Sequence, residues 1–131
     1  MPDRIRLTLP SSPQYVSVAR LAAGEAADRA GLDHDAAEDV RLATSEACTN
    51  AVRHAGDART IEVEFGPGDG EMSVAVSWTR SGAQPADHLD QVELDEEELG
   101  LMLIHDLTDE VVTQTALAGR STIRFVRRAE S

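Results

Sequence analysis

The chain has 131 residues, 24 of them acidic and 12 basic, so its formal net charge is −12 at neutral pH. This length suits one domain, 1–131, and the acidity argues against direct binding of nucleic acid, whose phosphates need basic partners. We find no apolar run near the ~20 residues that cross a bilayer and no signal peptide, and the single Cys48 suits a reducing cytoplasm.

The first third of the chain predicts a strand followed by two helices. Residues 4–9 alternate between apolar and polar side chains, as in a half-buried strand. A helix is expected over 14–30, closed by Gly31. Its predicted buried stripe consists of apolar residues at helical spacing, Val18, Leu21, Ala22 and Ala26.

The longest predicted helix covers 33–56. Asp33 or Asp35 can cap its start, and Gly56 suits the left-handed residue that follows a helix end. Small apolar residues three and four apart indicate one buried face, formed by Ala36, Val40, Ala43, Ala47 and Ala51.

Beyond Gly56 the periodicity changes from helical to alternating. Strands are predicted at 60–65, 72–78, 109–115 and 121–126, with a short buried helix at 99–107. The sequence GPGDGE between the first two strands is a hairpin signal, which is favoured over a phosphate-binding loop. Residues 80–98 lack periodicity, and their acidic part, 87–98, predicts a mobile exposed loop. The order β-α-α-β-β-loop-α-β-β predicts an α+β two-layer sandwich.

Glu46 and Asn50 are four residues apart in the long helix and so lie on one side of it. A carboxylate one turn from a carboxamide can act as a general base beside an oxygen ligand for a metal ion. On its own this spacing is more typical of a solvated helix face than of a catalytic pair. The four histidines show no spacing of a zinc site, which disfavours a metal hydrolase.

This order of elements, with E-A-C-T-N-A-V-R-H at 46–54, resembles the anti-sigma factor kinases of the RsbW/SpoIIAB type, in the GHKL group of ATPases and kinases. The resemblance covers nearly the whole chain, including Ala19-Arg20, the G-L-M-L-I-H-D-L-T-D-E-V stretch from Gly100, and the tail up to Phe125. It implies the Bergerat-type sandwich, a mixed and mostly antiparallel sheet covered by helices on one face.

The resemblance also implies roles for individual residues. Glu46 matches the general base that activates a serine for phosphorylation, and Asn50 matches the Mg²⁺ ligand beside the ATP phosphates. Arg20 matches a partner-contact position, although a solvated arginine is about as common there. The remaining matched positions, implied to bind the cofactor, are Arg53, Gly82, Gly100 and Thr122.

The sequence departs from the family at the first glycine box, D-x-G-x-G. Trp78 stands where the family's aspartate reads the adenine amino group, Arg80 replaces the first glycine, and Gly82 survives. An indole can only donate a hydrogen bond and is far bulkier than a carboxylate. Trp78 is interpreted either as an ordinary strand residue or as a filler of the adenine pocket. The acidic loop 87–98, placed at the family's ATP lid, would repel phosphates.

These observations predict a cytoplasmic, homodimeric anti-sigma factor that sequesters a sigma factor and is released by an anti-anti-sigma (STAS) protein. ATP and Mg²⁺ binding is expected to be weakened or lost. The alternative is an active ATP-dependent serine kinase that phosphorylates the anti-anti-sigma partner. Neither version binds nucleic acid directly or spans a membrane.

Overall fold

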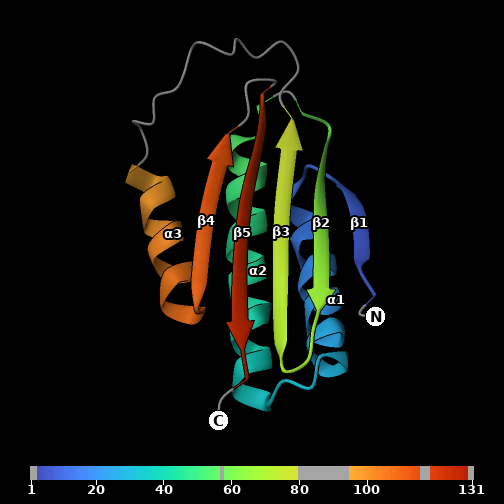
Figure 1. Ribbon diagram of the computed structural model, residues 1–131. Helices are drawn as coiled ribbons and strands as arrows, with labels where there is room; N and C mark the ends of the chain where they lie inside the picture. The colour runs from blue at the N-terminus through green and yellow to red at the C-terminus, as the bar shows by residue number, and fades with distance from the viewer. Residues whose placement is uncertain (1–2, 57, 80–94, 116–118, 130–131) are drawn as a thin grey trace.

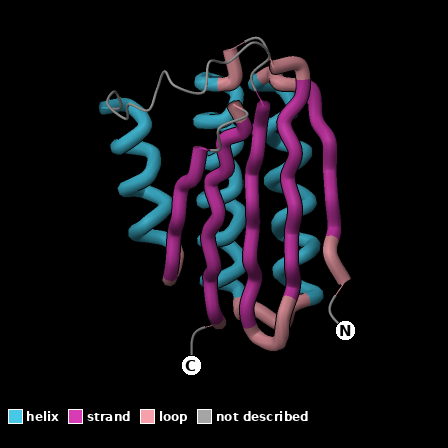
Figure 2. Tube along the Cα trace, turned by 45° about the horizontal axis from the view of Figure 1, so that its top comes forward, coloured by secondary structure: helices cyan, strands magenta, loops and turns pink. Residues whose placement is uncertain are grey.

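A five-stranded antiparallel sheet, covered on one face by helices, makes up the protein (Figures 1 and 2). The computed structural model describes residues 3–56, 58–79, 95–115 and 119–129. Its strands follow the order β1-β2-β3-β5-β4. Their bounds are β1 Ile5–Pro10, β2 Thr60–Pro67, β3 Glu71–Thr79, β4 Glu110–Thr115 and β5 Arg120–Arg128.

The helices are a short 3₁₀ turn, Pro13–Tyr15, then α1 Val16–Arg29, α2 His34–His54 and α3 Asp95–Leu107. The predicted α+β sandwich is therefore confirmed. Every pairing among the described strands is antiparallel, so the mixed and mostly antiparallel sheet that was expected has no parallel pair among them. No helix in the described part of the chain is long and apolar enough to cross a membrane.

Local signals at both ends of α2 explain its bounds. The Asp33 carboxylate accepts a hydrogen bond from the backbone N–H of Ala36 at 3.3 Å, so Asp33 rather than Asp35 caps the helix. Past the other end, Gly56 adopts a φ of 62°, a conformation that costs a glycine little. The five small residues predicted to face the core are all fully buried.

The predicted buried stripe of α1 is wrong in part. Ala26 is buried, but Leu21 is 74% exposed and Val18 is 42% exposed. The buried face consists of alanines instead, Ala19, Ala23, Ala26 and Ala27. Small side chains let α1 approach α2 and the sheet closely, so side-chain size rather than hydrophobicity decides which face turns inward. The two larger apolar residues are left on the outer surface.

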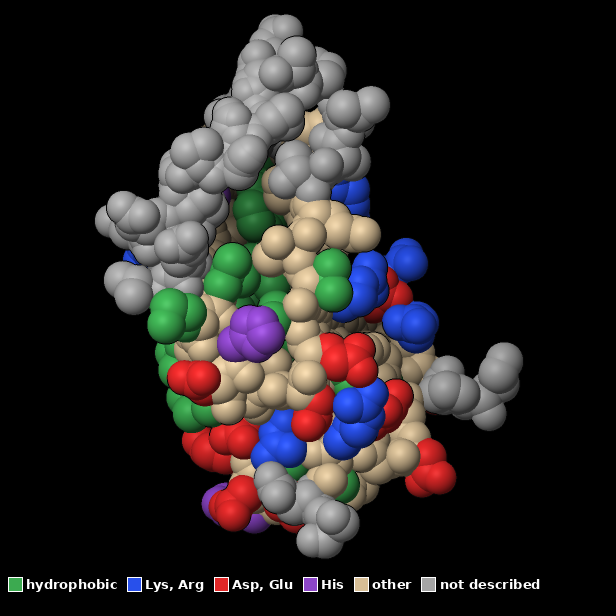
Figure 3. Space-filling view, turned by 60° about the vertical axis from the view of Figure 1, so that its left-hand side comes forward, with side chains coloured by type: hydrophobic (Ala, Val, Ile, Leu, Met, Phe, Trp, Pro, Cys, Tyr) green, Lys and Arg blue, Asp and Glu red, His purple; other side chains and the backbone are tan. Residues whose placement is uncertain are grey.

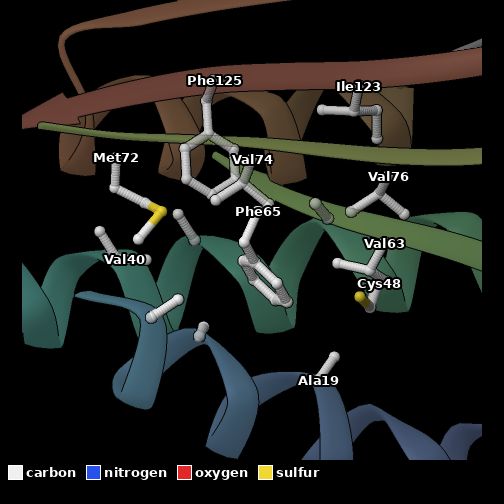
Figure 4. Close-up of a cluster of buried hydrophobic side chains, with 14 of the residues drawn as sticks. Ala19, Val40, Cys48, Val63, Phe65, Met72, Val74, Val76, Ile123 and Phe125 are labelled. Carbon is white, nitrogen blue, oxygen red and sulfur yellow. The ribbon is translucent and has the colours of Figure 1, made fainter. Parts of the chain in front are cut away.

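The core lies between the sheet and the two long helices (Figure 4). Phe65, Met72 and Phe125 are essentially fully buried and point from the strands toward α1 and α2. Cys48 of α2 joins this layer, and burial raises the pKa of its thiol to about 12. The thiol therefore stays protonated at neutral pH, which excludes it as a nucleophile.

The third helix begins earlier than the sequence suggested. α3 starts at Asp95, so residues 95–98 of the expected acidic loop are helical, while 80–94 lie outside the described residues. Aspartate and glutamate are favourable in the first turn of a helix, where they face the positive end of its dipole. Ile104 anchors α3 in the core, whereas Met102 and Leu103 remain exposed. Figure 3, turned so that the left-hand side of Figure 1 comes forward, shows hydrophobic side chains at the surface of that face.

Candidate functional site

Glu46 and Asn50 lie on the flank of α2 that faces away from α1. The opposite flank contacts α1, since Ser45 accepts a hydrogen bond from Arg20 at 3.4 Å. Asp39, two turns before Glu46 on the same flank, binds Arg127 of β5, which fixes the direction of this flank. Since α3 also packs against α2, the Glu46–Asn50 pair lies on the side of α2 shared by β5 and α3.

The burial of Asn50 on this flank does not stabilise the fold. Its side chain is 2% exposed, yet neither its amide oxygen nor its amide nitrogen has a hydrogen-bond partner among the described residues. The Thr44 hydroxyl is in the same condition. Burying such groups without partners costs about 1–3 kcal/mol each. Glu46, one turn before Asn50, is only partly buried. An amide held this way is suited to receive a ligand.

Trp78 lies near the end of β3, on the face of the sheet that the helices cover. It alternates in phase with Met72, Val74 and Val76, all of which point into the core. The Trp78 side chain is 7% exposed and belongs to the core cluster. The carboxyl-terminal ends of β3 and α2 lie at the same end of the molecule (Figure 1). Trp78 and Asn50 are therefore at the same end of the layer between sheet and helices.

These two residues give different answers when tested against Mg-ATP. The buried carboxamide of Asn50 fits a Mg²⁺ ion, which takes one or two protein oxygens and keeps water and phosphate oxygens as its other ligands. The buried indole at Trp78 does not fit an adenine amino group, because it offers no acceptor. Among the described residues, no three His, Cys, Asp or Glu side chains gather into a metal-binding group.

The other predicted site residues come from several parts of the fold, and of these Arg53 shares α2 with Asn50. Arg53 is exposed in the last turn of α2, and Gly100 lies within α3. Gly82 lies outside the described residues. Thr122 is on the face of the sheet away from the helices, where its hydroxyl lies 3.2 Å from that of Ser77. The structure therefore does not bring Thr122 together with Asn50.

Sequence reasoning missed Ser121, which pairs directly with Trp78 on the helix-facing side. The alternation of the last strand held the signal, because its buried residues are Ile123, Phe125 and Arg127, and Ser121 is in phase with them. Placing Ser121 from sequence required knowing which of the two phases faces the helices.

Comparison with known proteins bears on this arrangement. The family model described as "Histidine kinase-like ATPase domain" matches residues 9–127. The chain belongs to this family. Within it, the chain is 36% identical over 128 residues to a protein named serine-protein kinase RsbW from Bacillus velezensis, covering 86% of this chain and 79% of that one.

Other relatives carry the same name. A Bacillus cereus serine-protein kinase RsbW is 35% identical over 121 residues, covering 83% of this chain and 76% of the relative. One from Listeria monocytogenes is 44% identical over 80 residues, only 59% of this chain and 51% of that protein. The predicted resemblance to RsbW-type proteins is thus confirmed, and ATP and Mg²⁺ binding is a general property of this ATPase and kinase family.

A solved structure shows the same fold. The crystal structure of the RsbU and RsbW domains of Rv1364c from Mycobacterium tuberculosis superposes with a TM-score of 0.70 at 23% identity. The match covers 96% of this chain and 32% of that one. At this identity the likeness supports the architecture and nothing finer.

Proposed function

We propose that this protein is a cytoplasmic anti-sigma factor that captures an alternative sigma factor, acts as a homodimer, and releases the sigma factor to an anti-anti-sigma (STAS) protein. In this proposal its affinity for nucleotide is weakened. Family membership supplies the class of function. The observation that carries the proposal for this chain is the outer surface of α1.

The capture surface proposed on α1 consists of Val18, Arg20 and Leu21. Leu21 is 74% exposed, more than any other large apolar residue of the described chain. Arg20 is held beside it by its hydrogen bond to Ser45. Exposed apolar residues next to an arginine are a frequent composition of protein interfaces, where arginine is enriched. The net charge of −12 favours a basic partner and speeds its approach.

Weakened nucleotide binding is supported by Trp78. A buried indole replaces the carboxylate that the family uses to accept the adenine N–H, and losing such a match costs roughly 100-fold or more in affinity. With nucleotide held only weakly, Glu46 would seldom have a phosphoryl donor beside it when it activates a serine, so sequestration rather than phosphorylation would be the main activity.

The test of capture is binding of the purified chain to individually purified sigma factors and STAS proteins of the source organism. Leu21→Asp and Arg20→Glu should each weaken the productive complex by about tenfold or more. Met102→Asp is the matched control, because Met102 is 60% exposed on α3, away from α1. Failure of every sigma factor and every STAS protein to bind would refute the proposal, and equal losses in the control would move the surface elsewhere.

An active serine kinase is the second candidate, and Asn50 favours it. A buried amide without a partner, one turn from a part-exposed carboxylate, is the arrangement that a Mg-ATP site needs. Transfer of the γ-phosphoryl group to a STAS protein, lost in Glu46→Ala with sigma-factor binding intact, would establish the kinase. Absence of transfer with intact capture would leave the sequestering protein.

A further inference from the structure

The two ends of the candidate site differ in what they can recognise. We infer that this site holds its ligand only through magnesium and phosphate oxygens, so that it takes Mg-ATP, Mg-GTP and Mg-tripolyphosphate with nearly equal affinity. The inference rests on the placement of the nucleotide site given above, and it concerns the class of ligand, not the capture of a sigma factor.

The phosphate end of the inference stands on Asn50. Both polar atoms of its amide are buried, and no described side chain or backbone group satisfies them. Its carboxamide oxygen is the type of ligand that Mg²⁺ takes from proteins, and its amide nitrogen can donate to a phosphate oxygen. Arg53, one turn further along α2 and exposed, is long enough and free enough to add a charge-assisted contact to an anion.

Among the residues that the structure describes, the base end offers no side chain that separates one base from another. Along β3 the described side chains facing the helices are Met72, Val74, Val76 and Trp78, none of which carries an oxygen or nitrogen that can accept a hydrogen bond from a base. Directly opposite Trp78 is Ser121, whose hydroxyl both donates and accepts and so suits any base equally.

The bulk of Trp78 reinforces this conclusion. The indole is 7% exposed and packed within the core, so the space beside β3 is taken up by the protein itself. A base of any identity would then stay outside the helix–sheet layer. Sites that hydrogen-bond a substrate group reject analogues lacking it by large factors, whereas a site without such contacts cannot discriminate.

The experiment is calorimetric titration of the full chain with Mg-ATP, Mg-GTP and Mg-tripolyphosphate at one ionic strength. We expect dissociation constants below about 1 mM that agree within about threefold, and a loss of about tenfold or more for all three in Asn50→Ala. Thr49→Ala, the next residue on the outer side of α2, is the matched control and should leave all three unchanged. ATP bound at least tenfold more tightly than GTP, or no binding of any of the three, would overturn the inference.

Fluorescence gives an independent readout, because Trp78 is the single tryptophan of the chain. Its emission should change by the same amount with Mg-ATP as with Mg-tripolyphosphate. A change specific to ATP would place a base against the indole and contradict the inference. Sigma-factor capture is measured without any of these ligands, so failure here is distinct from failure of the proposed function.

Discussion

One flank of α2 carries two polar side chains, Asp39 and Asn50, which differ in whether a hydrogen-bond partner is present among the described residues. Near its start, Asp39 is bonded to Arg127 through a single carboxylate oxygen, at 3.2 Å from Nε and 2.9 Å from Nη2. Near its end, Asn50 is more deeply buried and has no partner among the described residues. At the first end, which we call the closed end, the polar group is bonded to another side chain of the protein. At the second, the open end, the amide is available to a ligand.

The closed end is embedded in a wider network of charges. Arg127 also donates to the backbone carbonyl of Arg128 at 2.6 Å, and Arg128 bonds Glu110 at 2.7 Å. Figure 3 shows acidic and basic side chains close together in the lower half of the face that it presents. These contacts tie α2 to β4 and β5, so they hold the flank in place while its other end keeps an unsatisfied amide. We therefore expect the Asp39 end of the flank to stabilise the fold and the Asn50 end to bind a ligand.

The largest expected effect comes from opening the closed end. Arg127→Met removes the partner of the Asp39 carboxylate, whose side chain is 29% exposed, and we expect the free energy of unfolding to fall by about 2 kcal/mol. Urea denaturation measures it. Arg128→Met is the control, since that side chain is 50% exposed and its loss should cost much less. If the two variants lose the same stability, the ion pair does not fix this end.

Much of the fold was predictable because its signals are local. The Asp33 cap, the Gly56 terminator and the alternation of β2 and β3 each depend on a few neighbouring residues. The orientation of α1 was not predictable from its local sequence. Whether Leu21 or Ala23 faces inward depends on how closely α2 approaches, and the sequence of α1 alone does not contain that distance.

In the candidate site, too, the features set by local sequence were predictable and those set by distant elements were not. That Glu46 and Asn50 share a flank follows from helix geometry, and the sequence predicted it. That Asn50 is buried depends on the elements packed against α2, such as β5 and α3, which lie far along the chain. The phase of the last strand likewise decides between Ser121 and Thr122, and only the pairing with β3 reveals it.

A smaller effect is expected from Cys48, which lies in the packed layer rather than on the flank with Asn50. Its thiol pKa is raised from 9.0 to about 12 in the folded protein, so above pH 9 the unfolded chain loses a proton that the folded one keeps. Stability is therefore full below pH 9 and falls as the pH rises, by about 1.4 kcal/mol at pH 10. Urea denaturation at pH 8 and pH 10 measures this loss. The free energy of unfolding should fall between the two pH values by about 1.4 kcal/mol more in the unmodified chain than in Cys48→Ala, which has no thiol to titrate. Parallel losses in the two proteins would show that the thiol is not the cause.

The smallest expected effect is also the one that bears most directly on the open end. Replacing Asn50 by leucine removes two buried polar atoms that have no partner in the part of the chain that the structure describes, and keeps a side chain of similar size. Because such groups destabilise the fold, Asn50→Leu should raise the free energy of unfolding of the ligand-free protein by about 1 kcal/mol, while abolishing its Mg-dependent binding of phosphates. Thr49→Val, a change of similar shape on the outer side of α2, should stay within about 0.5 kcal/mol of the unmodified chain. A structural asparagine gives the opposite sign, since its replacement would lower stability whether or not a ligand is present. The direction of this one difference therefore separates a residue kept for packing from a residue kept for a ligand.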